Sequence, residues 1–189
     1  MRKINRIHEN FIDNHLLDFV EYTMPFYRKL NMTPNQITFI SLIFALIGSY
    51  FYCVNKFYLS IFCFAMSYYL DCVDGHYARK YNMTSKFGDY FDHYSDILKI
   101  LVLLYCMYKK DKKMAMINSI ILGILLVFMT VHFGCQQKIK EEKHEDEPFM
   151  NISKQFCPDP NWIHKTKHFG SGTFYLVVII MILYTKFKD

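Results

Sequence analysis

Two long uncharged apolar stretches restrict this chain to a membrane environment. They run from Ile37 to Val54 and from Met114 to Phe133. Each is long enough to cross a hydrocarbon core of roughly 30 Å as an α-helix. Of the 189 residues, 52% are hydrophobic, a composition that fits a protein with a large surface in contact with lipid. The sequence therefore predicts an all-α integral membrane protein, and nothing in it indicates a nucleic-acid partner.

Three further spans are predicted from shorter apolar runs. Two of these runs reach spanning length only if the acidic segment between them is also helical, which gives helices over 57–78 and 88–108. The third covers 169–187. The predicted architecture is a bundle of about five transmembrane helices, multi-pass, within a membrane domain of residues 33–189.

The N-terminal segment, residues 1–32, is predicted to be an amphipathic juxtamembrane region. Over 9–30 an apolar set recurs at helical spacing opposite a polar set that includes Asp13 and Asp18. The apolar set consists of Ile12, Leu16, Phe19, Val20, Thr23 and Tyr27. The helix is expected to break near Pro25, and it could lie on the membrane or against the spans of the protein itself.

The segment 136–168 is predicted to be a polar, solvent-exposed loop. It carries mixed charges and three prolines, Pro148, Pro158 and Pro160, without apolar periodicity. The six cysteines form no C-x-x-C pair and mostly lie in apolar runs, so neither a disulfide framework nor a zinc site is expected. They are Cys53, Cys63, Cys72, Cys106, Cys135 and Cys157.

The acidic segment contains four aspartates at helical spacing. Asp71 and Asp74 are three residues apart, and Asp92 and Asp96 are four apart, so each pair projects from one face of its own helix. Two such faces turned together would form a pocket of four carboxylates. Hard oxygen ligands suit Mg²⁺ or Mn²⁺, and two such ions clamp a phosphoryl displacement. Metal-dependent phosphate chemistry is therefore the leading hypothesis.

The residues beside the aspartates fit a bulky anionic ligand. Gly75, Ala78 and Gly88 leave space next to the acidic faces, and Arg79 presents a planar guanidinium suited to a phosphate or diphosphate. Lys99 could neutralise Asp96 or bind an acceptor phosphate, but snorkelling to the membrane interface is the preferred interpretation. His76 and His93 are interpreted as supporting or interfacial residues rather than metal ligands.

These positions together resemble a family signature. The pattern Asp71-x2-Asp74-Gly75-x2-Ala78-Arg79-x8-Gly88-x3-Asp92-x3-Asp96 is similar to that of the CDP-alcohol phosphotransferases, whose members typically have six spans. The stretch from Thr33 to Thr38 also resembles the start of the first span in that family. The resemblance covers roughly residues 33–133.

The resemblance implies roles for individual residues. Asp71, Asp74 and Asp92 would bind the metal ions, and Asp96 would complete the metal site and act as general base. Gly75, Arg79 and Ser85 would contact the CDP-linked donor beside the small residues Ala78 and Gly88, while Asn35 and Thr38 would approach its nucleotide or diphosphate. It also implies CMP release, a lipid substrate in the membrane and a possible homodimer.

Local details leave the substrate open. The tripeptide Asp74-Gly75-His76 looks like phosphatidylinositol synthases, whereas Phe91-Asp92-His93 looks like choline and ethanolamine phosphotransferases that use diacylglycerol. The short chain favours the first group, with CDP-diacylglycerol as donor and a small polar alcohol such as inositol as acceptor. A divalent cation transporter or channel that uses the same aspartates is the alternative from another class.

The distribution of Lys and Arg predicts the orientation. If the N-terminus is cytoplasmic, fourteen of these residues lie on the cytoplasmic side of the five spans and seven on the other. The positive-inside rule then places the acidic segment at the cytoplasmic face. The sequence does not specify the organelle.

Overall fold

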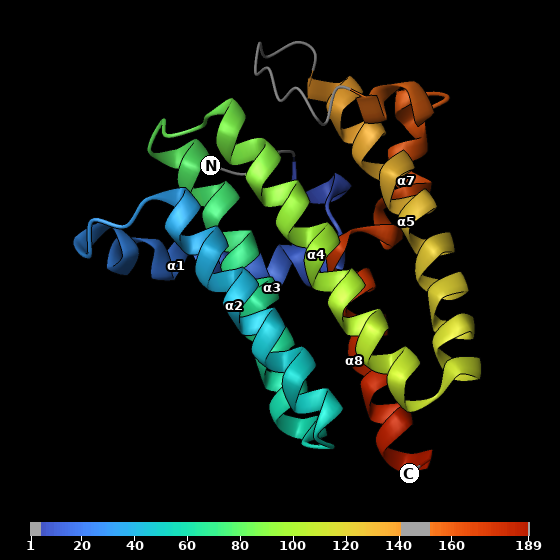
Figure 1. Ribbon diagram of the computed structural model, residues 1–189. Helices are drawn as coiled ribbons and strands as arrows, with labels where there is room; N and C mark the ends of the chain where they lie inside the picture. The colour runs from blue at the N-terminus through green and yellow to red at the C-terminus, as the bar shows by residue number, and fades with distance from the viewer. Residues whose placement is uncertain (1–4, 141–151, 189) are drawn as a thin grey trace.

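A computed structural model describes residues 5–140 and 152–188, apart from the side chain of Lys140, and within these ranges the chain forms helices and turns with no strand. Figure 1 shows the arrangement. The long helices are α1 (Phe11–Lys29), α2 (Pro34–Cys53), α3 (Phe57–Lys80), α4 (Lys86–Lys110), α5 (Lys112–Lys140) and α8 (Ser171–Lys188). The short elements are η1 (Arg6–His8), η3 (Lys154–Phe156), η4 (Pro160–Trp162), α7 (Ile163–Thr166) and η5 (Lys167–Phe169).

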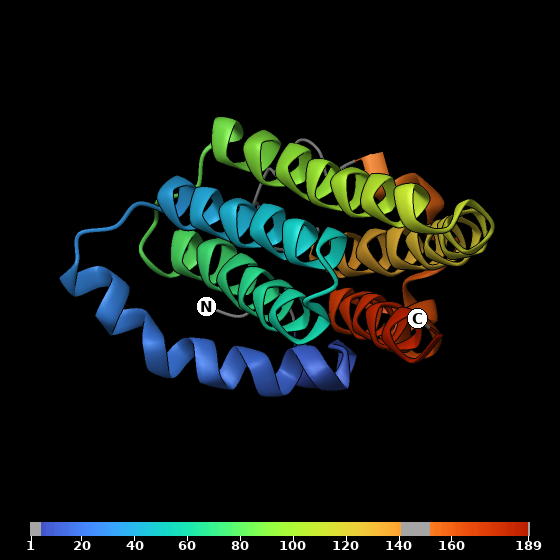
Figure 2. The same cartoon turned by 60° about the horizontal axis from the view of Figure 1, so that its bottom comes forward.

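Five of the long helices form the bundle, and α1 crosses it. Helix α2 lies between α3 and α4 and packs against both (Figure 2). Helix α8 packs against α3 and α5, and α5 joins α4 at the foot of Figure 1 and separates from it towards the top. The end of α3, the start of α4 and the end of α5 therefore lie at one end of the bundle.

Local sequence signals explain where the helices begin and end. Thr33 and Gln36 form a reciprocal capping box at the start of α2, where Pro34 occupies the first turn. Asn31, Asn55 and Asn82 follow α1, α2 and α3 with positive φ angles of 51°, 61° and 54°. Asparagine tolerates this left-handed conformation, which lets the following backbone amides cap the last helical carbonyls.

The protein is an all-α membrane protein. Three described segments are long and apolar enough to cross a membrane: Pro34–Cys53, Lys112–Ile139 and Pro160–Lys188, the last of which includes α8. Helices α3 and α4 have 24 and 25 residues, a length of about 36 Å at 1.5 Å per residue. These two helices are less hydrophobic than the three segments above because they contain the acidic segment. As the sequence predicted, the first part of that segment continues α3 and its last part begins α4.

Two apolar clusters hold the bundle together. The larger contains buried side chains from α2, α3, α4, α5 and α8, among them Phe64, Leu103, Leu122 and Ile182. The smaller joins α1 to α2 and α3 through Val20, Met24, Ile37, Leu70, Val73 and Tyr77. Because α3 contributes to both clusters, the helix that carries Asp71 and Asp74 is fixed on several sides.

The structure corrects two predictions for α1. The helix continues through Pro25, which lies on its exposed side. Proline has no amide hydrogen to donate to the carbonyl of Glu21 one turn earlier, and because Glu21 is also exposed this carbonyl faces outward. Asp13, expected on the polar face, is only 7% exposed, whereas Phe19 of the expected apolar face is 54% exposed. The helix packs on α3 and α8, and its aromatic side chains Phe11, Phe19, Tyr22 and Phe26 remain outside.

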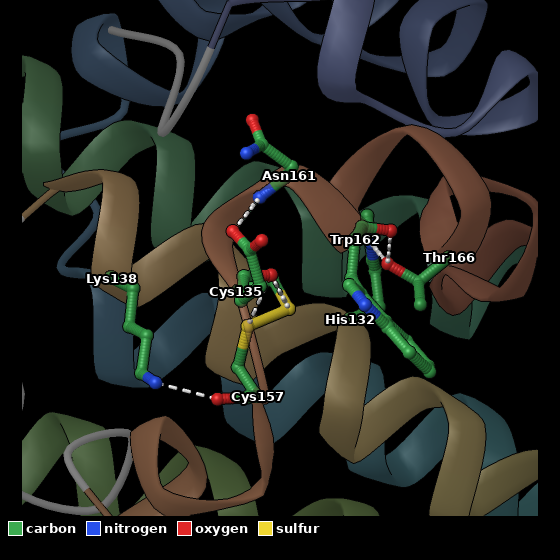
Figure 3. Close-up of a disulfide and its surroundings, with 8 residues drawn as sticks. His132, Cys135, Lys138, Cys157, Asn161, Trp162 and Thr166 are labelled. Atoms are coloured by element: carbon green, nitrogen blue, oxygen red, sulfur yellow. Dashed lines mark hydrogen bonds between the residues drawn. A yellow bond between two sulfur atoms is a disulfide. The ribbon is translucent and has the colours of Figure 1, made fainter.

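Residues 136–140 and 152–168 differ from the predicted loop in being mostly helical and in carrying a disulfide, while residues 158–162 are exposed as predicted; residues 141–151, with Pro148, lie outside the described residues. Helix α5 extends to Lys140, and the described part from residue 152 forms short helical turns against it. Cys135 and Cys157 form a disulfide (Figure 3). Both cysteines are buried in a small cluster with Ile163. Lys138 donates a hydrogen bond to the Cys157 carbonyl. The two cysteines are 22 positions apart in the sequence, so local spacing gave no sign of the pair.

Candidate active site

A cavity of about 860 Å³ lies at the end of the bundle where α3 ends and α4 begins. Its polar wall carries all four aspartates of the acidic segment together with Arg79. Its apolar wall is formed by α4 and α5, with Ile97, Ile100, Leu101, Leu104, Leu126, Met129 and Phe133. The cavity therefore joins a charged pocket to a surface that suits hydrocarbon.

Three of the aspartates converge. Ligand oxygens of Asp71 and Asp74 on α3 and of Asp92 on α4 all lie within 4.8 Å of one another. We call these three residues the aspartate triad. Three carboxylates at this separation, one on a different helix from the other two, provide the hard oxygen donors that Mg²⁺ and Mn²⁺ prefer.

Two details of the triad fit a bound cation. Oδ1 of Asp92 is buried and has no hydrogen-bond partner among the described residues. An orphaned buried carboxylate oxygen is costly unless a ligand satisfies it. Asp74 is 3% exposed and accepts a hydrogen bond from the Thr38 hydroxyl at 2.5 Å, which fixes the orientation of its carboxylate. The side chain of Thr38, predicted to approach the donor, is thus engaged with Asp74.

Asp96 has a different environment from the triad. Its Oδ1 accepts a hydrogen bond from Lys99 Nζ at 2.8 Å, and the same nitrogen lies 2.6 Å from Oδ1 of Asp71. Lys99 is 2% exposed. The preferred interpretation of Lys99 as a snorkelling residue was therefore wrong, because two carboxylates hold its ammonium group inside the bundle.

The small residues make room for neighbouring polar groups. A Cβ on Gly75 would lie 3.3 Å from Nη1 of Arg79, so the glycine lets the guanidinium lie against α3. Nε of Arg79 is buried and has no hydrogen-bond partner among the described residues. Ala78 lines the cavity beside them. Arg79 can therefore still bind an anion in the cavity.

Ser85, Gly88 and Asn35 meet at the start of α4. The Ser85 hydroxyl accepts a hydrogen bond from the Gly88 amide at 3.0 Å and caps the helix. A Cβ on Gly88 would lie 3.0 Å from Oδ1 of Asn35, so the glycine allows α2 and α4 to approach. All three residues line the cavity. The structure thus brings every predicted donor-binding residue to one cavity, and their roles stay predictions.

Comparison with known proteins agrees with this geometry. The sequence model of the CDP-alcohol phosphatidyltransferase family matches residues 31–187. The chain belongs to this family. The match extends well beyond the signature region and includes α5 and α8.

Two curated relatives match over part of their length. An archaetidylinositol phosphate synthase of Pyrococcus horikoshii is 38% identical over 78 residues, which is 41% of each chain. An uncharacterized protein of Aquifex aeolicus is 29% identical over 90 residues, 46% of each chain. The matched part of this chain therefore spans less than half the length of these relatives. No solved structure matches the chain.

The two histidines near the aspartates lie outside the triad. His76 is fully buried, and its Nε2 lies 3.3 Å from Oε1 of Glu21 on α1. Nδ1 of His93 lies 2.7 Å from the backbone carbonyl oxygen of Asp89, one turn earlier in α4. Both contacts agree with the prediction of supporting rather than ligating residues, and His76 connects α1 to the helix that carries Asp74.

Part of the cavity wall was not predicted. Glu9 and Asp13 at the N-terminal side of the molecule, Gln136 of α5, and Ser153 and Phe156 near the disulfide also line it. These residues lie far from the signature in sequence and follow no motif, so only the packing of α1 and of residues 152–169 on the bundle brings them there.

Proposed function

We propose that the protein is a metal-dependent transferase of phospholipid biosynthesis. It transfers the phosphatidyl group of a CDP-linked lipid, CDP-diacylglycerol, to the hydroxyl of a small polar alcohol such as inositol and releases CMP. Membership of the CDP-alcohol phosphatidyltransferase family supports the reaction class. The observation that carries the proposal is the convergence of Asp71, Asp74 and Asp92 within 4.8 Å beside a cavity that also contains Arg79.

In this proposal the triad, completed by Asp96, holds Mg²⁺ or Mn²⁺, with two ions predicted from the signature. Bound divalent ions would neutralise the diphosphate of the donor and stabilise the CMP leaving group. Thr38 keeps Asp74 oriented, and Arg79 binds a phosphate oxygen of the donor. Ser85, Gly88 and Asn35 form the wall against which the nucleotide lies.

Asp96 acts on the acceptor. Its carboxylate accepts the proton of the acceptor hydroxyl while that oxygen bonds to the phosphorus that carries the diacylglycerol group. The bond from this phosphorus to the bridging oxygen breaks, and CMP leaves with that oxygen. Because a carboxylate is a weak base, Asp96 works chiefly by holding the hydroxyl in line and accepting its proton as the new bond forms.

The apolar wall supports a lipid as one of the two substrates. Two stretches of the chain line this part of the cavity, Ile97 to Leu104 of α4 and Leu126 to Phe133 of α5. Every side chain that they contribute to the lining is apolar except that of Thr130. Such a wall accommodates the acyl chains of a lipid substrate, which is the donor if CDP-diacylglycerol is used and the acceptor if diacylglycerol reacts with CDP-choline. The name of the Pyrococcus relative supports an inositol-based acceptor.

The decisive experiment identifies the lipid product. Purified protein in lipid nanodiscs is incubated with CDP-diacylglycerol, Mg²⁺ or Mn²⁺, and a panel of alcohols that includes inositol, inositol phosphate, glycerol phosphate, serine and ethanolamine. We expect CMP release and one new phospholipid by mass spectrometry. A parallel incubation with diacylglycerol and CDP-choline or CDP-ethanolamine tests the alternative in which the donor is water-soluble and the lipid is the acceptor. Ion flux in proteoliposomes without CMP release from any pair would contradict the proposal and favour a channel.

Replacement of Asp96 separates chemistry from binding. Asp96→Asn should lower the rate of CMP release about 10²- to 10⁴-fold, the range for loss of a general base, while binding of CDP-diacylglycerol changes little. Asp18→Asn, an exposed residue of α1 paired with Arg6, is the matched control and should keep wild-type turnover. Wild-type CMP release by Asp96→Asn would exclude Asp96 as the base.

A further inference from the structure

A short segment between α5 and α8 forms part of the cavity wall. We call residues 152–157, which contain η3, the strap. The side chains of Ile152, Ser153 and Phe156 line the cavity. In Figure 1, α5 and the short elements packed on it lie to the right of α4, whereas α2, which carries Asn35, lies to its left. The strap and the proposed donor wall therefore bound the cavity from different sides.

Contacts of three kinds attach the strap to the last turns of α5. The disulfide between Cys135 and Cys157 is covalent, and Lys138 Nζ donates a hydrogen bond to the Cys157 carbonyl oxygen at 2.5 Å (Figure 3). A Cβ on Gly134 would overlap the carbonyl oxygen of Ser153, so the glycine lets the backbone of the strap lie directly on the helix. Of these contacts, the disulfide is the one that thiol chemistry can open.

Cys135 is flanked by residues that contact the strap and the cavity. Gly134 meets the strap, and Gln136 lines the cavity. Nε2 of Gln136 lies 2.8 Å from Nε2 of His132 and 3.4 Å from Oε1 of Glu9. The disulfide thus joins the strap to the turn of α5 that supplies a polar part of the cavity wall, so displacement of the strap changes the shape of the cavity.

Apolar packing around the disulfide is limited. Among the described residues, the two cysteines share their buried cluster with Ile163, and Val131 and Ile139 pack against it partly buried. The strap itself leaves Ile152 and Phe156 60% and 56% exposed. A segment with few buried apolar contacts opens locally at a small free-energy cost compared with global unfolding. The covalent bond is therefore the main restraint on the strap.

The location of the pair fits redox control. Disulfides that form in the cytosol are mostly transient or redox-sensing, and the distribution of Lys and Arg favours a cytoplasmic position for this end of the bundle. One thiolate of a dithiol attacks a sulfur of the pair, forms a mixed disulfide and releases the other cysteine. The second thiol then displaces the remaining cysteine. The dithiol becomes a cyclic disulfide, and its two electrons and two protons pass to Cys135 and Cys157.

We propose that the Cys135–Cys157 disulfide is a redox-controlled fastening that holds the strap in the cavity wall. The oxidised protein keeps the cavity closed around the acceptor, and reduction by a dithiol releases the strap and weakens acceptor binding. This inference concerns regulation of the candidate site and rests on the proposed function for the identity of the acceptor. Release of the strap also admits water, so hydrolysis of the donor to phosphatidic acid and CMP competes with transfer.

The test compares oxidised protein, protein treated with dithiothreitol, and the variant Cys135→Ala/Cys157→Ala. Alkylation of free thiols and mass spectrometry establish the redox state of the pair. We expect backbone amide exchange of the strap to be at least about tenfold faster in the second and third samples, with unchanged exchange in α2. The KM for the acceptor should rise at least about threefold, while the KM for CDP-diacylglycerol changes less than about twofold. The proportion of phosphatidic acid among the products should increase.

A second pair of thiols requires a control. Cys53 and Cys106 are free cysteines that hydrogen-bond to each other in the bundle. Cys53→Ala should respond to dithiothreitol as wild type does, because the strap keeps its disulfide until reduction. Cys135→Ala/Cys157→Ala should not respond at all. If this double variant does not fold, the comparison of oxidised and reduced wild type still decides the question.

Three results would overturn the inference. The first is release of both thiols with no change in strap exchange or in the acceptor KM. The second is the finding that both thiols are free in protein purified without reductant. The third is faster exchange throughout the bundle with equal loss of affinity for both substrates, as expected for a purely structural disulfide. Exchange and alkylation need no turnover, so absence of any lipid product would contradict the proposed function and leave these measurements to decide whether the strap is released.

Discussion

At the scale of single residues, burial decides which of the acidic side chains have unusual properties. Asp13 of α1 accepts hydrogen bonds from the Tyr68 hydroxyl and from the amide of Gly172, and it lies near Glu9. Burial, with a smaller contribution from the charge of Glu9, raises the pKa of Asp13 to about 8. Asp13 lies outside the spans and is therefore a residue through which pH can act on the docking of α1.

This raised pKa predicts a pH dependence of stability. In the unfolded chain Asp13 loses its proton near its ordinary pKa of 3.8, whereas the folded protein keeps the proton up to a pKa of about 8. The folded state thus binds the extra proton between these values, so the stability contributed by Asp13 falls as pH rises from about 4 to about 8. Asp13→Asn should remove this loss, which is on the order of several kcal/mol.

The measurement is the apparent Tm in detergent at pH 5, 6.5 and 8. We expect Asp13→Asn to exceed wild type by an amount that grows with pH, because asparagine keeps the hydrogen bond from Tyr68 without a titrating proton. Asp18→Asn on the same helix should follow the wild-type curve. A constant difference between Asp13→Asn and wild type across the three pH values would contradict the assignment.

At the scale of elements, glycine at the start of α8 determines how closely α1 can approach. A Cβ on Gly172 would lie 2.7 Å from Cβ of Ile12 and 2.9 Å from Oδ1 of Asp13. The Asn10 side chain reaches across the same contact and donates to the Lys167 carbonyl and to the Thr173 hydroxyl. Close backbone approach and these hydrogen bonds together attach α1 to α8.

Gly172→Ala should therefore destabilise the protein by about 1–3 kcal/mol, the usual cost of overpacking a tight contact. A lower apparent Tm and faster proteolysis of α1 would be the observable effects. Gly123→Ala is the matched control, because a Cβ at Gly123 meets no atom within 4 Å. Alanine there should be neutral or stabilising by up to about 1 kcal/mol through helix propensity. Equal behaviour of the two variants would exclude the contact as the cause.

At the scale of the whole molecule, the candidate site and the disulfide lie at the same end of the bundle. The balance of Lys and Arg favours a cytoplasmic position for this end. Disulfides such as Cys135–Cys157 persist mainly in oxidising compartments, which favours the opposite orientation. The two physical arguments conflict, so orientation needs a direct measurement.

Glycosylation of Asn82 measures the orientation directly. This residue begins the sequon Asn82-Met83-Thr84 in the exposed turn between α3 and α4, at the same end as the site. We expect no glycan on Asn82 when the protein is expressed in a eukaryotic host, in agreement with a site that faces the cytoplasm. A sequon engineered next to Asn55, in the turn at the other end of the bundle, serves as the control and should be glycosylated. A glycan on Asn82 would place the site and the disulfide in the lumen.

The sequence by itself determined the helices that carry the acidic segment, the most apolar helices and the pairing of aspartates within each helix, because these depend on spacing along a single element. Asp71 with Asp74 and Asp92 with Asp96 share helical faces whatever the rest of the chain does. Only the tertiary structure decided that Asp92 joins the triad, that Lys99 contacts Asp71, that Asp13 is buried, and that Cys135 bonds to Cys157. These contacts join residues on different elements or depend on the cavity between helices, and no local periodicity records which faces of separate helices meet.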